Sequence, residues 1–209
     1  MAAQQLKVLA FNCSLKSEKA DEKSSTQVLL EQLMAELEKQ GATGSIVRAV
    51  DHNIKPGVES DEGEGDAWPA LYDQIMRCNI LVMATPIWLG QPSSVAKRVM
   101  ERMNAFIYET DDFVRKPSYG KVAIVAVVGN EDGAHHCAAE LIQGLTEVGF
   151  TVPPGGVTYW VGEALGEKEY KDLRKMPTEV FNVMHMLVLD ATHLARLLKG
   201  KTYPGWVEA

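Results

Sequence analysis

Short apolar runs alternate along this chain with segments of helical periodicity, and this alternation constrains the fold more than any other feature. The runs are rich in Val, Ile, Leu and Ala, and several are apolar at successive positions, as is typical of strands buried on both faces. They lie at 6–11, 45–50, 80–84 and 121–128, and a short fifth strand is expected at 150–152. Because strands that alternate with helices form parallel sheets, we predict an α/β fold, a doubly wound five-stranded parallel sheet with helices on both faces.

The helical segments are marked by apolar residues that recur every three or four positions. Two of their ends carry further signals. Pro69 suits the first turn of a helix, and Gly200 is a typical stop after the last one. The segments expected to be helical are 30–37, 68–77, 95–106, 141–148 and, as a long C-terminal helix, about 178–199.

The 209 residues fit a single domain, because no repeat or low-complexity linker divides them. One segment has an unusual composition: between Glu59 and Asp66 five residues are acidic and none is basic. Such a run of like charge is typical of a solvated surface. We therefore predict one domain, 1–209, with an exposed and mobile acidic excursion at about 56–67, between the second strand and the next helix.

The formal net charge is −7, from 21 basic and 28 acidic residues. Without the five acids of the 59–66 segment, 23 acidic residues stand against 21 basic ones, so the rest of the chain is nearly neutral. A nucleic-acid-binding domain needs concentrated positive charge, and we predict no nucleic-acid partner. A nearly neutral body does not oppose the binding of a phosphate.

Three cysteines, Cys13, Cys78 and Cys137, lie too far apart in the sequence for a zinc motif, a redox dithiol or an iron–sulfur motif. Their odd number, and a start without a basic leader and apolar stretch, indicate the reducing cytoplasm. The longest uncharged stretch, 78–96, contains two prolines and cannot form a continuous apolar helix. We expect a cytoplasmic protein without a membrane span.

The first strand leads through a loop rich in hydroxyl groups into a helix. Ser24 and Gln27 have the spacing of a capping box, which predicts the helix start. A helix start offers free N–H groups and the positive end of the helix dipole, and both favour a phosphate. The chain has neither G-x-G-x-x-G nor a P-loop motif, and an ordinary capped helix is the alternative. The candidate phosphate ligands are Ser14, Lys16, Ser24, Ser25 and Thr26.

A second loop, after the third strand, presents a large apolar surface at a strand's carboxyl end, where ligands bind in such sheets. This surface suits a flat aromatic ligand, and backbone amides can recognise the ligand's polar edge. The alternative is that Trp88 packs onto a neighbouring helix or subunit. The candidate residues are Thr85, Pro86, Ile87, Trp88, Leu89 and Gly90.

A third loop follows the fourth strand and again precedes a helix. Its two glycines let the backbone approach a ligand closely, and its polar side chains offer short contacts. The alternative is a plain turn before a capped helix, with Asp132 near the cap. His135 and His136 point in different directions on a helix and have no evident third partner, so we predict no metal. The candidate residues are Gly129, Asn130, Glu131, Asp132 and Gly133.

Taken together, the motifs resemble the flavodoxin-like NADPH-dependent FMN reductase family, a broad group that includes NAD(P)H:quinone oxidoreductases. The resemblance runs from about Lys7 to Trp160. The family often has a glycine where this chain has Cys13, and Asn-Thr where it has Ser25-Thr26. The cysteine cluster of its iron–sulfur members is absent. The motifs that carry the resemblance are Ser14-x-Lys16 with Ser24-Ser-Thr26, Thr85-Pro-Ile-Trp-Leu-Gly90 and Gly129-Asn-Glu-Asp-Gly133.

The resemblance implies FMN as the cofactor and NAD(P)H as the co-substrate. The first loop would hold the FMN phosphate, the second would line the isoalloxazine ring, and the third would close its other side. No catalytic side chain is assigned, because FMN itself carries the chemistry. Tyr159 and Trp160 would border the flavin edge or a subunit contact, or else form a buried pair. A homodimer or homotetramer is also implied, because the family commonly completes its pocket with a second subunit.

The activity that the resemblance implies is hydride transfer from NAD(P)H through FMN to a quinone, a free flavin or a similar small acceptor. A flavodoxin-like electron carrier, or a flavin-binding signalling module without a dedicated substrate, is the rival interpretation. A purely structural relative that binds no flavin is a third. No motif locates a basic residue for a 2′-phosphate, so both nicotinamides stay open as donors.

Overall fold

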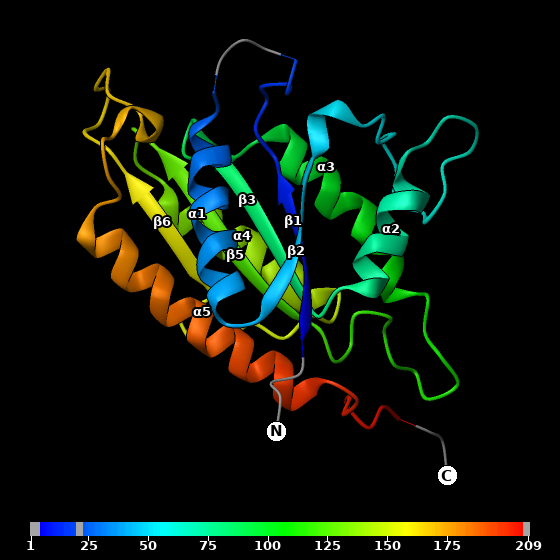
Figure 1. The fold of residues 1–209 in the computed structure, drawn as a ribbon. Coiled ribbons are helices and arrows are strands. Elements are labelled where there is room, and N and C mark those ends of the chain that lie inside the picture. The colour runs from blue at the N-terminus through cyan, green and yellow to red at the C-terminus, as the bar shows by residue number, and fades with distance from the viewer. Residues whose placement is uncertain (1–4, 20–22, 207–209) are drawn as a thin grey trace.

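Five parallel strands form the central sheet of the computed structural model, which describes residues 5–19 and 23–206 (Figure 1). Their order in space is β2-β1-β3-β5-β6, and the two-residue strand β4 pairs antiparallel with the end of β3. This arrangement confirms the predicted α/β fold with a doubly wound parallel sheet. The strands are β1 (Leu6–Asn12), β2 (Ala42–Arg48), β3 (Ile80–Trp88), β4 (Gln91–Pro92), β5 (Val122–Gly129) and β6 (Val157–Val161).

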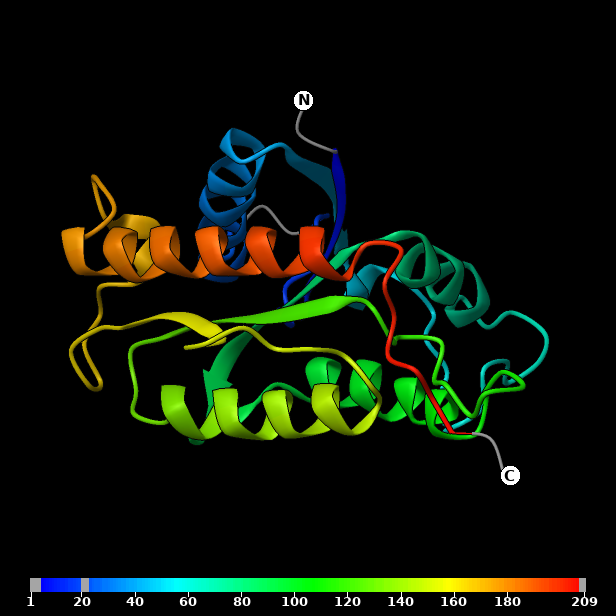
Figure 2. The same cartoon turned by 90° about the horizontal axis from the view of Figure 1, so that it is seen from below.

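Helices cover both faces of the sheet, α1 and α5 on one face and α2, α3 and α4 on the other (Figure 2). Each of the five segments expected to be helical contains a helix. Pro69 lies in the first turn of α2, and Gly200 follows α5 with a φ of 73°. The helices are α1 (Ser25–Lys39), α2 (Trp68–Arg77), α3 (Ser94–Arg102), α4 (Ala134–Glu147) and α5 (Thr178–Leu198), with short 3₁₀ turns at Ala49–Asp51, Met103–Ile107 and Tyr170–Asp172.

Two apolar layers, one on each face of the sheet, make up the core. Alternate residues of β3 and β5 point into one layer or the other, and both strands are buried along nearly their whole length. The layer under α1 and α5 contains Leu30 and Leu187, and the opposite layer contains Trp68 and Phe106. This double burial explains why the central strands are apolar at successive positions.

Two predicted strands are wrong in their limits. The second strand is β2, not 45–50, and residues 49–51 form a 3₁₀ turn. Strand β2 lies at the edge of the sheet and exposes Gly44 and Ser45, so its sequence lacks a continuous apolar run. The fifth strand is β6, not 150–152, because Thr151 makes only an isolated bridge to Val122. Two prolines follow at 153 and 154, and residues without N–H donors interrupt a ladder.

The third strand continues beyond its predicted end at residue 84, as far as Trp88, and turns back into β4. Leu89 and Gly90 form this turn with φ values of 54° and 73°. Two consecutive residues with positive φ make the tight turn that best suits a hairpin. Glycine adopts this conformation freely, whereas Leu89 adopts it against the steric preference of its side chain. The second loop is therefore a hairpin.

The acidic segment is anchored to the core by its last member, Asp66. This side chain is fully buried, lies 2.7 Å from Nη2 of the buried Arg102, and accepts hydrogen bonds from the backbone N–H groups of Lys55, Glu62 and Trp68. Burial alone would raise the pKa of Asp66, but these hydrogen bonds hold it well below its ordinary value. Glu59 is exposed, whereas Asp66 tethers the end of the segment to the core.

Neither a membrane-spanning helix nor a metal site is found in the part of the chain that the structure describes. Within it, no helix combines the length and the apolar character needed to cross a bilayer. The same residues bring together no group of three or more His, Cys, Asp or Glu side chains that could hold a metal ion.

Candidate functional site

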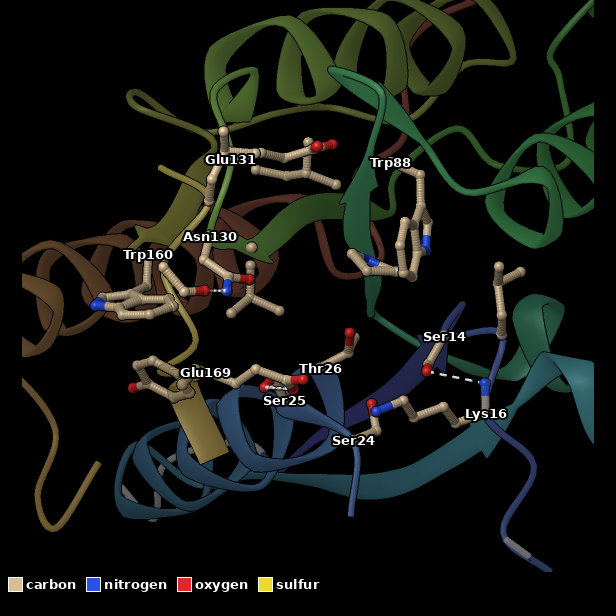
Figure 3. A pocket seen from close by; sticks show the side chains of 18 residues that line it. Ser14, Lys16, Ser24, Ser25, Thr26, Trp88, Asn130, Glu131, Trp160 and Glu169 are labelled. Carbon is tan, nitrogen blue, oxygen red and sulfur yellow. Dashed lines mark hydrogen bonds between the residues drawn. The ribbon is translucent and has the colours of Figure 1, made fainter. Parts of the chain in front are cut away.

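A cavity of about 320 Å³ opens beyond the carboxyl ends of β1, β3 and β5 (Figure 3). The chain order of the sheet reverses between β1 and β3, and ligands bind at such switch points in doubly wound sheets. The three predicted loops meet here. The cavity is lined by Ser14, Leu15, Lys16, Ser24, Ser25, Thr26, Pro86, Ile87, Trp88, Val128, Gly129, Asn130, Glu131, Trp160, Leu165, Gly166, Glu169 and Tyr170.

One end of the cavity is formed by the N-terminus of α1. Ser24 is the N-cap, and its Oγ accepts a hydrogen bond from the N–H of Gln27 at 3.4 Å. Ser14 Oγ accepts in the same way from the N–H of Lys16 at 3.1 Å. A hydroxyl has one donor and two acceptor positions, so each of these serines still has a hydrogen to donate to a ligand. The helix dipole adds partial positive charge at this end.

A buried amide holds this polar end in place. Asn12 is fully buried at the end of β1; its Oδ1 accepts from the N–H of Ser14 at 2.9 Å, and its Nδ2 donates to Gln27 Oε1 at 2.7 Å. Arg48 donates both to Gln27 Oε1 and to the carbonyl of Lys16. Ser24 thus caps the helix as predicted, whereas the Gln27 side chain contacts Asn12 and Arg48. Only one half of the predicted capping box forms.

The opposite end of the cavity is aromatic. Trp88, 52% exposed at the end of β3, lies across the cavity from Trp160 of β6 (Figure 3). Trp160 contacts the ring of Tyr170, with ring centroids 5.3 Å apart. Pro86 and Ile87 complete the wall on the side of β3. Two tryptophans on opposite sides of an open cavity offer the flat faces on which a ring system can stack.

The second and third loops are joined where two glycines meet. A Cβ atom on Gly133 would come within 2.7 Å of the Cα atom of Gly90, so this approach requires glycine. Glu131 strengthens the contact, because its Oε1 accepts from the N–H of Gly90 at 3.1 Å. The Gly90 amide is therefore engaged by the protein itself, while Glu131 and Asn130 remain on the cavity wall.

Five of the predicted site residues lie outside the cavity lining. Thr85 is fully buried and accepts a hydrogen bond from the N–H of Ser93. Leu89 is 92% exposed at the hairpin tip, and Asp132 accepts from the N–H of Gly133. The hairpin of β3 and β4 accounts for Leu89 and Gly90, because it turns the end of the second loop away from the cavity. The five are Thr85, Leu89, Gly90, Asp132 and Gly133.

A segment that the sequence did not single out forms the remaining wall. We call residues 162–173, between β6 and α5, the strap. Its first half is bonded to the third loop, since the N–H of Leu165 donates to the carbonyl of Asn130 and Asn130 Nδ2 donates to the carbonyl of Gly166. Its second half is bonded to α1, since the Tyr170 hydroxyl donates to Gln32 Oε1 at 2.6 Å. Burial raises the pKa of Tyr170 to about 12, so its hydroxyl stays protonated.

Among the titratable side chains near the site, the two histidines face away from it. His136 bonds to Gln91 and Glu140, and His135 packs edge-on against Tyr159. Cys13 follows β1 but is fully buried, and desolvation raises the pKa of its thiol. None of these three belongs to the lining of the cavity in the described structure.

Comparison with known proteins assigns this chain to a family. The family described as NADPH-dependent FMN reductase matches residues 6–164 of this chain. The chain belongs to this family. Its members are flavin-dependent oxidoreductases on a flavodoxin-like sheet, which agrees with the resemblance found in the sequence.

Two comparisons at 30% identity or more, one of sequence and one of structure, extend the similarity of this FMN reductase family member beyond residue 164. A synthase for 8-demethyl-8-aminoriboflavin-5′-phosphate from Streptomyces davaonensis is 34% identical over 216 aligned positions, covering 98% of this chain and 82% of that protein. The structure of RosB with the bound intermediate 8-demethyl-8-formylriboflavin-5′-phosphate is 32% identical, with a TM-score of 0.84, covering 95% of this chain and 82% of the other. The apo NADH:FMN oxidoreductase EMOB shares the fold, with a TM-score of 0.62, 18% identity and coverage of 92% and 89%.

The donor set of this FMN reductase family member fits both parts of an FMN molecule. A phosphate needs hydroxyl and N–H donors, which α1 and Ser14 supply at one end. An isoalloxazine ring needs flat apolar surfaces and a few polar contacts, which Trp88, Trp160 and Asn130 supply at the other. One carboxylate, that of Glu169, lies among these hydroxyl and N–H donors, and Ser25 Oγ donates a hydrogen bond to it at 3.2 Å.

Proposed function

We propose that this cavity binds FMN, with the phosphate at the N-terminus of α1 and the isoalloxazine ring between the tryptophan of β3 and the wall made by β5 and the strap. The single observation that carries this proposal is the polarity of the cavity. Hydroxyl groups and a helix start gather at one end, and aromatic side chains gather at the other. A ligand that fits both ends is itself anionic at one end and flat at the other.

FMN, when bound, supplies hydride transfer, and the side chains bind and orient it. The hydroxyls of Ser14, Ser25 and Thr26 and the first N–H groups of α1 would hold the phosphate. Trp88 would cover one part of the ring system, and its half-exposed position leaves room at the mouth for a second flat molecule. The Asn130 side chain is tied to the strap, so it would fix the spacing between the third loop and the strap.

We propose hydride transfer from NAD(P)H to a quinone, a free flavin or a similar small acceptor as the reaction. The family membership and the open mouth of the cavity support this reaction. Donor and acceptor would use the same mouth in turn, because the cavity holds one ring system. A homodimer or homotetramer is part of the proposal, because Trp88 at the mouth and Leu89 at the hairpin tip leave apolar surface exposed.

A second candidate function treats the flavin phosphate as a substrate. The similarity to the Streptomyces davaonensis synthase over nearly the whole chain favours it, as does the TM-score of 0.84 to RosB. In this case the same cavity would release a chemically altered riboflavin 5′-phosphate. The two functions share the ligand but differ in whether that ligand leaves unchanged.

The test combines a spectrum, a rate and a mass. We expect the purified protein, incubated with FMN and desalted, to keep a flavin absorbance spectrum and to oxidise NADH or NADPH when a quinone or free flavin is added. Flavin extracted after turnover should have the mass of FMN. A changed mass would support the second candidate, and a protein that stays colourless would contradict both. Bound FMN without nicotinamide oxidation, in a monomer, would favour the electron carrier.

A further inference from the structure

Glu169 brings a negative charge to the helix start that we propose for the phosphate. Its Oε2 atom accepts a hydrogen bond from Ser25 Oγ at 3.2 Å, and the side chain lines the cavity beside Ser25 and Thr26 (Figure 3). The side chain is 36% exposed, so it can leave this position without opening the core. Hydroxyl groups and a helix N-terminus stabilise any anion, a carboxylate as well as a phosphate.

The same contact ties the strap to α1. Lys171 Nζ lies 3.3 Å from Glu169 Oε2, and the N–H of Lys171 donates to Ser25 Oγ at 3.3 Å. The Glu169 carboxylate also accepts from the N–H of Asp172, which caps the 3₁₀ turn that follows it. Ser25 is therefore the point at which the second half of the strap meets the helix start.

A phosphate and Glu169 compete for this point. The Ser25 hydroxyl has one hydrogen and donates it to one acceptor at a time. A phosphate at the helix start would also lie close to the carboxylate, and like charges at short range in a partly buried site repel each other strongly. Riboflavin carries no phosphate, so it can occupy the aromatic end of the cavity without disturbing Glu169.

We propose that Glu169 sets the preference of this cavity between phosphorylated and unphosphorylated flavins, because a flavin phosphate binds only by displacing the Glu169 carboxylate from Ser25. This inference rests on the proposed function, since it assumes that the cavity binds flavin. It makes Glu169 a specificity-determining residue. The strap then responds to the two flavins differently: FMN loosens its second half, and riboflavin leaves it in place.

The test compares the affinity for FMN with that for riboflavin. Glu169→Gln keeps an amide oxygen that can accept from Ser25 and from the N–H of Asp172, but removes the charge. Glu167→Gln is the matched control, because it removes the same charge from an exposed position of the strap outside the cavity lining. Dissociation constants for both flavins would be measured by fluorescence quenching at one ionic strength, for the wild type and both variants.

In Glu169→Gln we expect the affinity for FMN, relative to riboflavin, to rise at least tenfold, and in Glu167→Gln to change less than twofold. An unchanged or lower ratio in Glu169→Gln would overturn the proposal, as would an equal rise in both variants, which would indicate bulk charge. Wild-type protein that binds neither flavin would instead contradict the proposed function itself.

Hydrogen exchange provides a second measurement that needs no variant. In the wild type, backbone amides of residues 170–172 should exchange faster in the FMN complex than in the riboflavin complex, because FMN releases the carboxylate that caps this turn. Equal exchange in the two complexes, or slower exchange with FMN, would contradict the displacement of Glu169.

Discussion

Two ion pairs of this molecule involve loop residues, and they differ in how much water reaches them: one joins the acidic loop to α3, and the other lies within the strap. Arg102 and Asp66 are both fully buried and lie 2.7 Å apart. Lys171 and Glu169 lie 3.3 Å apart with 16% and 36% of their side chains exposed. The first pair has no path to solvent and no ligand to exchange with, so it fixes the acidic loop. In the second pair, Glu169 lies on the cavity wall, where we propose that a flavin phosphate displaces it. The difference in burial therefore distinguishes Arg102–Asp66, a fixed anchor, from Lys171–Glu169, a contact that solvent can reach.

Arg102→Ala should have the largest effect on stability. Removing the arginine leaves a buried carboxylate without its charged partner, and also removes hydrogen bonds to the carbonyls of Lys55 and Glu59, at a cost of about 3–5 kcal/mol. Urea unfolding measures the loss. Arg77→Ala removes an exposed pair with Asp73 and should cost less than about 1 kcal/mol. Similar costs for the two variants would contradict the distinction between buried and exposed pairs.

Acid should weaken the same anchor. The pKa of Asp66 is lower in the folded chain than in the unfolded chain, so its contribution to stability is complete above the unfolded value of about 4. That contribution is lost as the pH falls further, through the folded value. The free energy of unfolding of the wild type should therefore fall more steeply below about pH 4 than that of Asp66→Asn, which starts lower. If the free energies of unfolding of the two proteins fell in parallel with pH, Asp66 would not be a cause of the acid sensitivity.

The double variant Ser25→Ala/Thr26→Ala should weaken the binding of FMN by roughly a hundredfold or more, because it removes two hydrogen bonds to a charged group that contribute about 1.5–3 kcal/mol each. Riboflavin is the matched ligand and should lose much less affinity. Dissociation constants for both flavins provide the measurement. Equal losses of affinity for the two flavins would show that the hydroxyls do not hold the phosphate. Glu169 beside Ser25 would then not be a contact that a phosphate displaces.

Trp88→Ala should have the smallest effect, a loss of affinity of roughly tenfold or less, from about 1–1.5 kcal/mol of ring stacking. The loss should be the same for FMN and riboflavin, because the ring is common to both. Trp206→Ala is the control, since Trp206 is also exposed but lies in the C-terminal segment. A Trp88→Ala variant that binds both flavins like the wild type would assign Trp88 to packing against another surface.

The sequence predicts those parts of the fold and cavity that depend on local pattern. The apolar runs predict β1, β3 and β5, and the hydroxyl-rich loop identifies the helix start that forms one end of the cavity. The limits of β2 differ from the prediction, because a strand with one free edge tolerates Gly44 and Ser45 and gives a broken pattern.

The strap and the buried anchor could not be predicted, because both depend on contacts between distant parts of the chain. Glu169 and Ser25 are 144 positions apart in the sequence, and the buried Asp66 is paired with Arg102 of α3. In the sequence, Asp66 is one more acid in an acidic run. Residues 162–169 have the composition of a polar loop, and Leu165, 94% exposed with a φ of 61°, carries no periodic signal.

The strap also shows how this architecture can diversify. The match to the FMN reductase family ends at residue 164, whereas Glu169 and Tyr170 lie beyond it on the cavity wall. If Glu169 sets the flavin preference as we propose, this preference can change through residues of the strap while the sheet and the start of α1 keep their sequence. Exchanging the strap between relatives would then change the flavin preference without altering a strand, provided that the buried Tyr170 is kept.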